Sequence, residues 1–168
     1  HKLPGLLEAE YLLRKVPGVG VVRLGAADVV RHPLVQRIIE AYREAILETL
    51  KWAEKNAAET RLVQNGKLRT AATGNLTVAL FQHDTNRNQE PNLHFHAVVA
   101  NATKGADGKW RTLKNDRLWS LNTLLNSMTM ARFRLSVEKL GYTIGPIGKH
   151  GNFEAAGISR DQVMSFST

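Results

Sequence analysis

The sequence predicts an α+β fold, in which a palm-like antiparallel sheet is covered by long helices. Apolar residues recur at helical spacing between Pro33 and Ala58, and again between Asn115 and Gly141. Between these two series lie short extended segments that are separated by turn residues. Helices that alternate with antiparallel hairpins indicate a helical layer packed on one sheet.

The N-terminal third of the chain is expected to contain two helices and a strand. A short helix over Leu3–Lys15 ends at Val16-Pro17-Gly18, and a strand follows over Val19–Leu24. Pro33 suits the first turn of a helix, where its missing N–H costs nothing, and the pattern predicts a helix from Pro33 to Ala58. The apolar face of that helix is predicted to contain Val35, Ile38, Ile39, Tyr42, Ile46, Leu50 and Ala53.

The middle of the chain is expected to form antiparallel strands. Gln64-Asn65-Gly66-Lys67 lies between two extended segments, Arg61–Val63 and Leu68–Thr70, and Asn-Gly in that position is the strongest short signal of a β-hairpin. Two further strands follow, Asn75–His83 and Leu93–Thr103. Their nearly continuous apolar runs predict a sheet covered on much of both faces, with these two strands in a central position.

The C-terminal part returns to helix. A short strand is expected at Trp110–Leu113, and Asn115 or Asp116 then caps a helix that Gly141 ends. A second hairpin is predicted beyond that glycine, and the pair Ser159 and Gln162 matches the capping box of a closing helix through Phe166. The two strands of that second hairpin are expected at Tyr142–Ile147 and Asn152–Ala155.

Length and composition narrow the possible classes of protein. A chain of 168 residues can form one domain that buries about 70% of its unfolded surface, so we expect a single domain over residues 1–168. The net charge of +8 favours a polyanionic partner. There is no cysteine, which excludes disulfides and thiolate metal sites and fits a reducing cytoplasm. No apolar run approaches the roughly 18 residues of a membrane span, so membrane insertion is not expected.

Three histidines are the strongest functional signal in the chain. Alternate residues of a strand share a face, so His94 and His96 point the same way. His83 joins them if its strand pairs antiparallel with theirs across the loop that contains Pro91. Three neutral nitrogens on one side of an ion leave its other positions open, as catalytic metal sites require. We therefore expect one divalent ion, with Mg²⁺, Mn²⁺ and Zn²⁺ all open.

These residues also carry a resemblance to a known family. The segments Thr73–Thr85 and Glu90–Asn101, which include Gln82-His83-Asp84-Thr85 and Leu93-His94-Phe95-His96, resemble the three-histidine (HUH) motif of conjugative relaxases. In these plasmid mobilisation proteins a relaxase domain is fused to a helicase. The similarity covers roughly Gln36–Ser167 and keeps the spacing between the histidines. It continues through Asp107–Asp116, Lys139–Tyr142 and Gly148–Phe153.

The resemblance implies a metal-dependent enzyme that nicks single-stranded DNA at a plasmid transfer origin and so initiates conjugative DNA transfer. In this family a tyrosine attacks the phosphodiester and leaves a 5′-phosphotyrosine and a free 3′-hydroxyl, while a metal ion polarises the phosphate. The implied ligands are His83, His94 and His96. The implied setting is the bacterial cytoplasm, with relaxosome and type IV secretion coupling proteins as partners of a longer parent chain that carries a C-terminal helicase region.

The N-terminal part departs from the family pattern. The family's paired tyrosines and the strand with its activating Asp are not recognisable, and Tyr11 is the only early tyrosine. Tyr11 is a candidate nucleophile, although its ring also suits packing within a helix. Two alternatives stay open: a catalytic relaxase domain, or a remnant that binds metal and single-stranded DNA without cleaving it. A three-histidine hydrolase or oxygenase of small molecules is disfavoured by the charge and by the length of the resemblance.

The remaining candidate residues surround the histidines or are basic. Asp84 is expected to support the loop or the second nitrogen of a ligand, rather than to act as a base. Arg87 lies in the loop between the histidine strands and matches an Arg of the family motif, which makes it the foremost DNA contact. Trp110 and Trp119 suit either base stacking or burial. The other candidate DNA contacts are Lys67, Arg69, Lys109, Arg111 and Lys114.

Overall fold

The computed structural model describes residues 33–88, 90–159 and 161. The helix expected at Leu3–Lys15, the strand expected at Val19–Leu24 and nearly all of the expected closing helix lie outside these residues. Apart from Pro33, every element below belongs to the compact unit Leu34–Thr168. None of the described helices is long and apolar enough to cross a membrane.

The described elements confirm the α+β class. The helices are α2 (Pro33–Ala57), α3 (Asp116–Ser120), α4 (Asn122–Lys139) and the 3-10 turn η1 (Lys149–Gly151). The strands are β1 (Glu59–Gln64), β2 (Lys67–Ala72), β3 (Val78–Thr85), β4 (Pro91–Val99), β5 (Thr103–Lys104), β6 (Trp110–Arg111) and β7 (Leu113–Lys114). All strand pairs are antiparallel, and the strands form three small sheets with the orders β2-β1-β7, β3-β4 and β5-β6.

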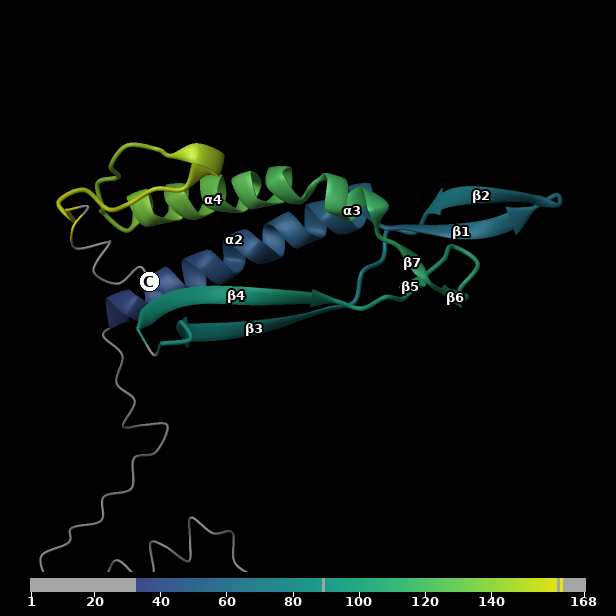
Figure 1. The fold of residues 1–168 in the computed structure, drawn as a ribbon, viewed down its shortest axis with the longest axis horizontal. Helices are drawn as coiled ribbons and strands as arrows, with labels where there is room; N and C mark the ends of the chain where they lie inside the picture. Colours follow the sequence, from purple (N-terminus) through teal and green to yellow (C-terminus); the bar gives the residue numbers. More distant parts are fainter. Residues whose placement is uncertain (1–32, 89, 160, 162–168) are drawn as a thin grey trace, which may run out of the picture. The chain divides into compact units, whose positions relative to one another are not determined.

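The prediction that the histidine strands are central in one sheet is wrong for the described part of the chain. There, β3 and β4 pair only with each other. The apolar runs are explained differently, because helices cover one face of the ribbon while Phe81 and Val98 on the other face are 51% and 55% exposed. Figure 1 shows α2 between α4 and this ribbon.

Helix α2 has nearly the predicted length but a different buried face. Its most buried residues are small and recur every four positions, a spacing that keeps them on one side of the helix. They are Ala41, Ala45, Thr49, Ala53 and Ala57. At this stripe the Thr129 hydroxyl of α4 donates a hydrogen bond to the Thr49 hydroxyl over 3.0 Å. The buried side of α2 therefore meets α4 at Thr49, and the larger predicted residues are less buried than this stripe.

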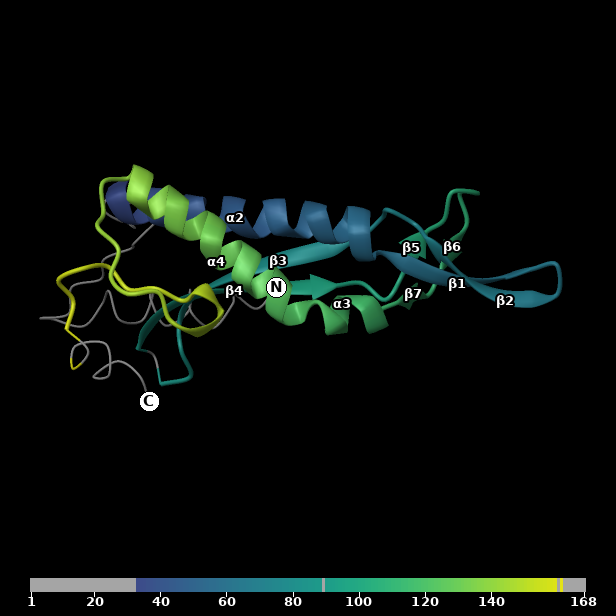
Figure 2. The same cartoon turned by 90° about the horizontal axis from the view of Figure 1, so that it is seen from above.

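The helix predicted from Asn115 or Asp116 to Gly141 is divided in two. Leu121 separates α3 from α4, with φ −95° and ψ 1°. The predicted end is confirmed, since α4 stops at Lys139 and Gly141 takes φ +94°, a value that favours glycine. Figure 2 shows the change of direction between the two helices.

The β1–β2 hairpin forms as predicted and is longer than expected. Asn65 and Gly66 both have positive φ, 51° and 72°, as a type I′ turn requires. At the other end of the hairpin β7 pairs with β1 for two residues only, Glu59 with Lys114 and Thr60 with Leu113. Figures 1 and 2 both show the hairpin extending beyond the end of α2.

Two regions that were predicted as strands contain less regular strand structure than expected. The strand at Trp110–Leu113 is split at Thr112, whose carbonyl accepts a hydrogen bond of 2.8 Å from the Thr60 hydroxyl. The predicted second hairpin is reduced to one bridge, Ile144 with Ala155, because η1 occupies its tip.

Candidate metal centre

The two faces of the β3–β4 ribbon have different chemistry. His83 lies directly opposite His94, and directly opposed residues of an antiparallel pair present their side chains on one face. His96, two residues beyond His94, shares that face. On the other face Phe95 meets Tyr42 edge to face, with ring centroids 5.3 Å apart. The ribbon therefore holds the histidines outward while an aromatic contact fixes its back to the helices.

The three imidazoles form a compact cluster. Their ring centroids are 5.2 Å (His83 and His94), 4.8 Å (His83 and His96) and 5.0 Å (His94 and His96) apart. One nitrogen from each ring lies within 4.8 Å of the others, and His94 is half-buried while the other two are exposed. Three such points share a centre within about 2.8 Å (4.8 Å divided by √3), against about 2.0–2.1 Å for a Zn–N bond. Small side-chain rotations would bring all three nitrogens to bonding distance, so the donor set fits one divalent ion.

A backbone carbonyl orients the half-buried histidine. The Nδ1 atom of His94 lies 2.9 Å from the carbonyl oxygen of Asn92. When Nδ1 carries the proton and donates it to this carbonyl, Nε2 keeps its lone pair for a metal ion. Sequence reasoning did not name this partner. It expected Asp84 to support the loop or the second nitrogen of a ligand, and the Asp84 carboxylate accepts a hydrogen bond of 2.9 Å from the Gln82 amide. A main-chain acceptor leaves no side-chain signature that could have revealed it.

The loop between β3 and β4 is organised by Asn86. Its side-chain oxygen accepts hydrogen bonds from the backbone N–H groups of Asn88 (2.9 Å) and Glu90 (3.0 Å), and its amide donates to the Glu90 carboxylate over 2.6 Å. Such local bonds are typical of Asn in turns. The pairing register also shifts between His83 and Thr85.

This loop brings Arg87 to the histidines. Arg87 and the three histidines line the same cavity, which has a volume of about 660 Å³. The lining residues are His83, Thr85, Asn86, Arg87, Asn92, His94 and His96. A cation beside three imidazoles makes this cavity suitable for an anion that also reaches the metal position.

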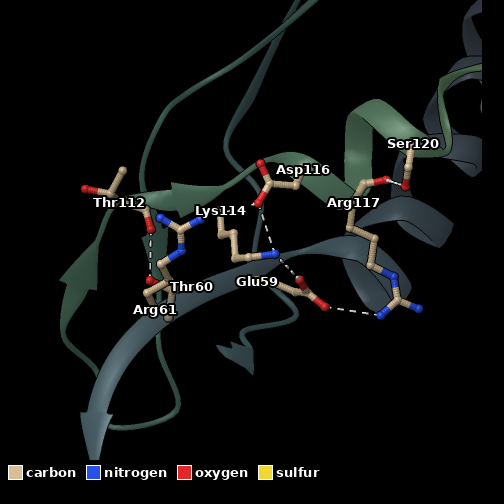
Figure 3. A network of polar contacts seen from close by, with 8 residues as sticks. All are labelled: Glu59, Thr60, Arg61, Thr112, Lys114, Asp116, Arg117 and Ser120. Atoms are coloured by element: carbon tan, nitrogen blue, oxygen red, sulfur yellow. Dashed lines mark hydrogen bonds and ion pairs between the residues drawn. The ribbon is translucent and has the colours of Figure 1, made fainter. Parts of the chain in front are cut away.

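The other predicted DNA contacts lie on other elements, and none of them lines the histidine cavity. Lys67 and Arg69 are exposed on β2, and Lys109 is exposed just before β6. Arg111 makes two hydrogen bonds, 2.6 and 2.7 Å long, to the Asp107 carboxylate, and these bonds hold the pKa of Asp107 well below its usual range. The remaining candidate, Lys114 on β7, lies 3.5 Å from Glu59 and 3.1 Å from Asp116, as Figure 3 shows.

No tyrosine of the described part lines the histidine cavity. Tyr11, the candidate nucleophile, lies outside the described residues. Tyr42 stacks on Phe133 with centroids 4.6 Å apart, and burial raises the pKa of its phenol, so it acts as a packing residue. Trp110 and Trp119 are 59% and 70% exposed, which favours neither as a core residue.

Comparison with known proteins gives a consistent result. The model of the TrwC relaxase family matches residues 26–168. Over 141 residues, 79% of the chain, the sequence is 39% identical to the multifunctional conjugation protein TraI of Escherichia coli, of which this stretch makes up 8%. The chain thus spans a small part of the length of that curated relative.

Solved structures agree with the sequence match. The metal-bound structure of the conjugative relaxase TrwC in complex with oriT DNA is 42% identical with a TM-score of 0.74, over 79% of this chain and 45% of that one. A complex of TrwC with a 27-mer DNA that comprises the recognition hairpin and the cleavage site has a TM-score of 0.75 at 32% identity, over 99% of this chain and 66% of that one. The fold, the histidine cluster and the extent of these matches lead to one conclusion: the chain belongs to the TrwC relaxase family.

Proposed function

We propose that this chain is part of an enzyme that nicks single-stranded DNA at a plasmid transfer origin and transfers the strand, initiating conjugation. The observation that carries the proposal is the cluster of His83, His94 and His96 on one face of β3–β4. Membership of the relaxase family and the solved complexes of TrwC with oriT DNA support it.

The three histidines would hold one divalent ion, with Mg²⁺, Mn²⁺ and Zn²⁺ all compatible with the donor set and a phosphate oxygen. When bound, the ion would withdraw electron density from the scissile phosphate and offset the charge that builds on its oxygens. The Asn92 carbonyl would keep the His94 ring in the tautomer that binds metal. Asp84 is proposed to support the loop that follows the site.

Arg87 would hold the DNA at the site. It lines the histidine cavity, and its guanidinium can form two parallel hydrogen bonds to a phosphate. Lys67, Arg69, Lys109, Arg111 and Lys114 would bind the backbone of the strand farther from the metal. Relaxosome and secretion coupling proteins are proposed as partners of the parent protein, in which residues 1–168 would form one relaxase domain joined to a helicase region.

Cleavage would require a tyrosine as nucleophile. Its phenol oxygen would form a bond to phosphorus as the bond from phosphorus to the 3′ oxygen breaks, and the phenol proton would pass to that 3′ oxygen. The products are a 5′-phosphotyrosine and a free 3′-hydroxyl. A phenol is a poor nucleophile at neutral pH unless it lies beside the metal-bound phosphate or a base.

A second function, binding of metal and single-stranded DNA without cleavage, is favoured by the absence of a tyrosine from the described lining of the cavity. Incubation of this chain with a transfer-origin strand and Mn²⁺, followed by mass spectrometry of phosphotyrosine peptides, separates the two. We expect no covalent adduct from the chain alone. We also expect an adduct once a segment with the family's paired tyrosines is added.

The variant Tyr11→Phe tests the remaining assignment. We expect it to change nothing, because Leu7–Leu13 shares only its early place with the family's tyrosine segment. An adduct mapped to Tyr11 in the unmodified chain, and lost in Tyr11→Phe, would assign Tyr11 as the nucleophile and exclude the non-cleaving alternative.

A further inference from the structure

A second cavity, apart from the histidine site, lies at the base of the β1–β2 hairpin. It has a volume of about 690 Å³ and forms where β1 and β7, after two paired residues, diverge. Its lining includes three cationic side chains, Arg61, Arg111 and Lys114, and one carboxylate, Asp116. Arg111 is already held by two hydrogen bonds to Asp107, so Arg61 and Lys114 are the cations at which an anionic group would bind.

The carboxylate occupies the place that such an anion would take. Figure 3 shows Asp116 beside two of these cations, Lys114 and Arg61. Its Oδ2 atom lies 3.1 Å from Lys114 Nζ and 3.5 Å from Arg61 Nη2. A carboxylate and a phosphodiester carry the same charge and accept the same charge-assisted hydrogen bonds.

A second carboxylate lies deeper and has a different role. Glu59 is 16% exposed and contacts Lys114 at 3.5 Å and Arg117 at 3.1 Å. It ties β1 to β7 and α3. Asp116 and Arg61, by contrast, are 63% and 59% exposed, and ion pairs so exposed contribute little to stability. The contacts of Glu59 therefore hold β1, β7 and α3 together, whereas the exposed ion pair of Asp116 with Arg61 can be exchanged for another anion at small cost.

We propose that Arg61 and Lys114 bind a backbone phosphate of single-stranded DNA, and that Asp116 occupies this phosphate site until the DNA displaces it. The inference rests on the proposed function, because the ligand is the same DNA strand. It adds Arg61 as a DNA contact and Asp116 as a competing internal anion. DNA is preferred to an acidic peptide because the adjoining β2 strand exposes two more cations, Lys67 and Arg69, along the same hairpin.

Opposite charge changes at the site give opposite effects on DNA affinity. Removing the internal anion with Asp116→Asn should tighten binding of a fluorescein-labelled, random-sequence single strand by about two- to fivefold. Removing a contact with Arg61→Ala should weaken binding and lower the slope of log K against log salt by about 0.7. Fluorescence anisotropy of the whole chain over a salt series measures both, and circular dichroism checks the fold.

A matched control separates a local effect from net charge. Glu48 on α2 forms an exposed ion pair with Lys51 over 2.7 Å, so Glu48→Gln also removes one exposed, paired carboxylate. The inference requires Asp116→Asn to bind DNA more tightly than Glu48→Gln. A polyglutamate peptide, added as competitor, tests the other class of anion.

Three outcomes would overturn the inference. Equal DNA affinities of Asp116→Asn and Glu48→Gln would refute this inference. Binding of the strand by the wild-type chain would still leave the proposed function intact. A gain by Asp116→Asn for polyglutamate, without a gain for DNA, would assign the cavity to an acidic peptide. Failure of wild type and all variants to bind the random-sequence strand would refute this inference, while the proposed function would fall only if a transfer-origin strand also failed to bind.

Discussion

The molecule contains two antiparallel ribbons, β3–β4 and β1–β2, that differ in how much of their surface packs against the helices. One face of β3–β4 packs on the helices through Phe95 and Tyr42, and the other carries three imidazoles. The β1–β2 hairpin is joined to the rest by two residue pairs with β7, and Val63 and Leu68 near its tip are 71% and 68% exposed. A ribbon with one face packed on helices can hold a small site with fixed geometry, whereas a hairpin without such packing presents an extended charged surface.

The largest expected effect concerns the histidines. His94→Asn should lower metal affinity more than about 100-fold, because a lost ligand costs more than a lost supporting bond, while the fold is kept. Isothermal titration with Mn²⁺ and Zn²⁺ measures this. His150→Asn is the matched control, since His150 lies outside the cluster and its φ of 61° is one that Asn tolerates. Unfolding of His94→Asn would mean that the cluster is structural.

The aromatic contact between Phe95 of β4 and Tyr42 of α2 is expected to give the next largest effect, which is on stability. Phe95→Ala should lower the free energy of unfolding by about 2–3 kcal/mol, below the range for a fully buried Phe because Phe95 is half-buried. Val63→Ala, at the exposed tip of the other ribbon, should change it by less than about 0.5 kcal/mol. Urea denaturation of both variants makes the comparison. Equal losses would contradict the difference in backing.

The third prediction concerns Arg87, a cation that lines the histidine cavity. Arg87→Ala should weaken binding of a transfer-origin strand by about fivefold or more, since it removes a phosphate contact next to the metal position. Lys55→Ala, on the exposed side of α2, should leave the affinity nearly unchanged. Anisotropy titrations at equal salt compare them, and similar losses in both would reduce Arg87 to a contribution of net charge.

The last effect, expected on stability and not on binding, concerns the turn of the β1–β2 hairpin. Gly66 has φ +72°, and a Cβ there would meet no atom within 4 Å, so Gly66→Ala should cost about 1 kcal/mol through backbone conformation alone. Metal affinity should not change, because the turn and the histidines lie on separate sheets. A metal affinity that fell together with stability would show that the two ribbons are coupled.

Local patterns were predictable from the sequence, and contacts between distant segments were not. Asn65-Gly66 and the period of two that joins His94 to His96 depend only on neighbours, and the structure has both the turn and the shared face. The interruption at Thr112 depends on a hydrogen bond from Thr60, 52 residues away, and Leu121 divides α3 from α4 without Gly or Pro to signal it.

Burial was the least predictable property. Apolar runs in β3 and β4 suggested central strands, but such runs record only that part of each strand is covered, and here helices cover one face. In α2 the large apolar residues suggested the core face, yet the buried residues are the small Ala45, Thr49 and Ala53, and Thr49 meets Thr129 of α4.

The bond from His94 to the Asn92 carbonyl has a consequence for how the site would be studied. Its acceptor belongs to the main chain, so any residue at position 92 that keeps the strand path also keeps the acceptor. A scan of side-chain substitutions would therefore record position 92 as tolerant, although its carbonyl orients the His94 ring. Replacing the amide between residues 92 and 93 with an ester, which makes that carbonyl a weaker acceptor, would reveal its role.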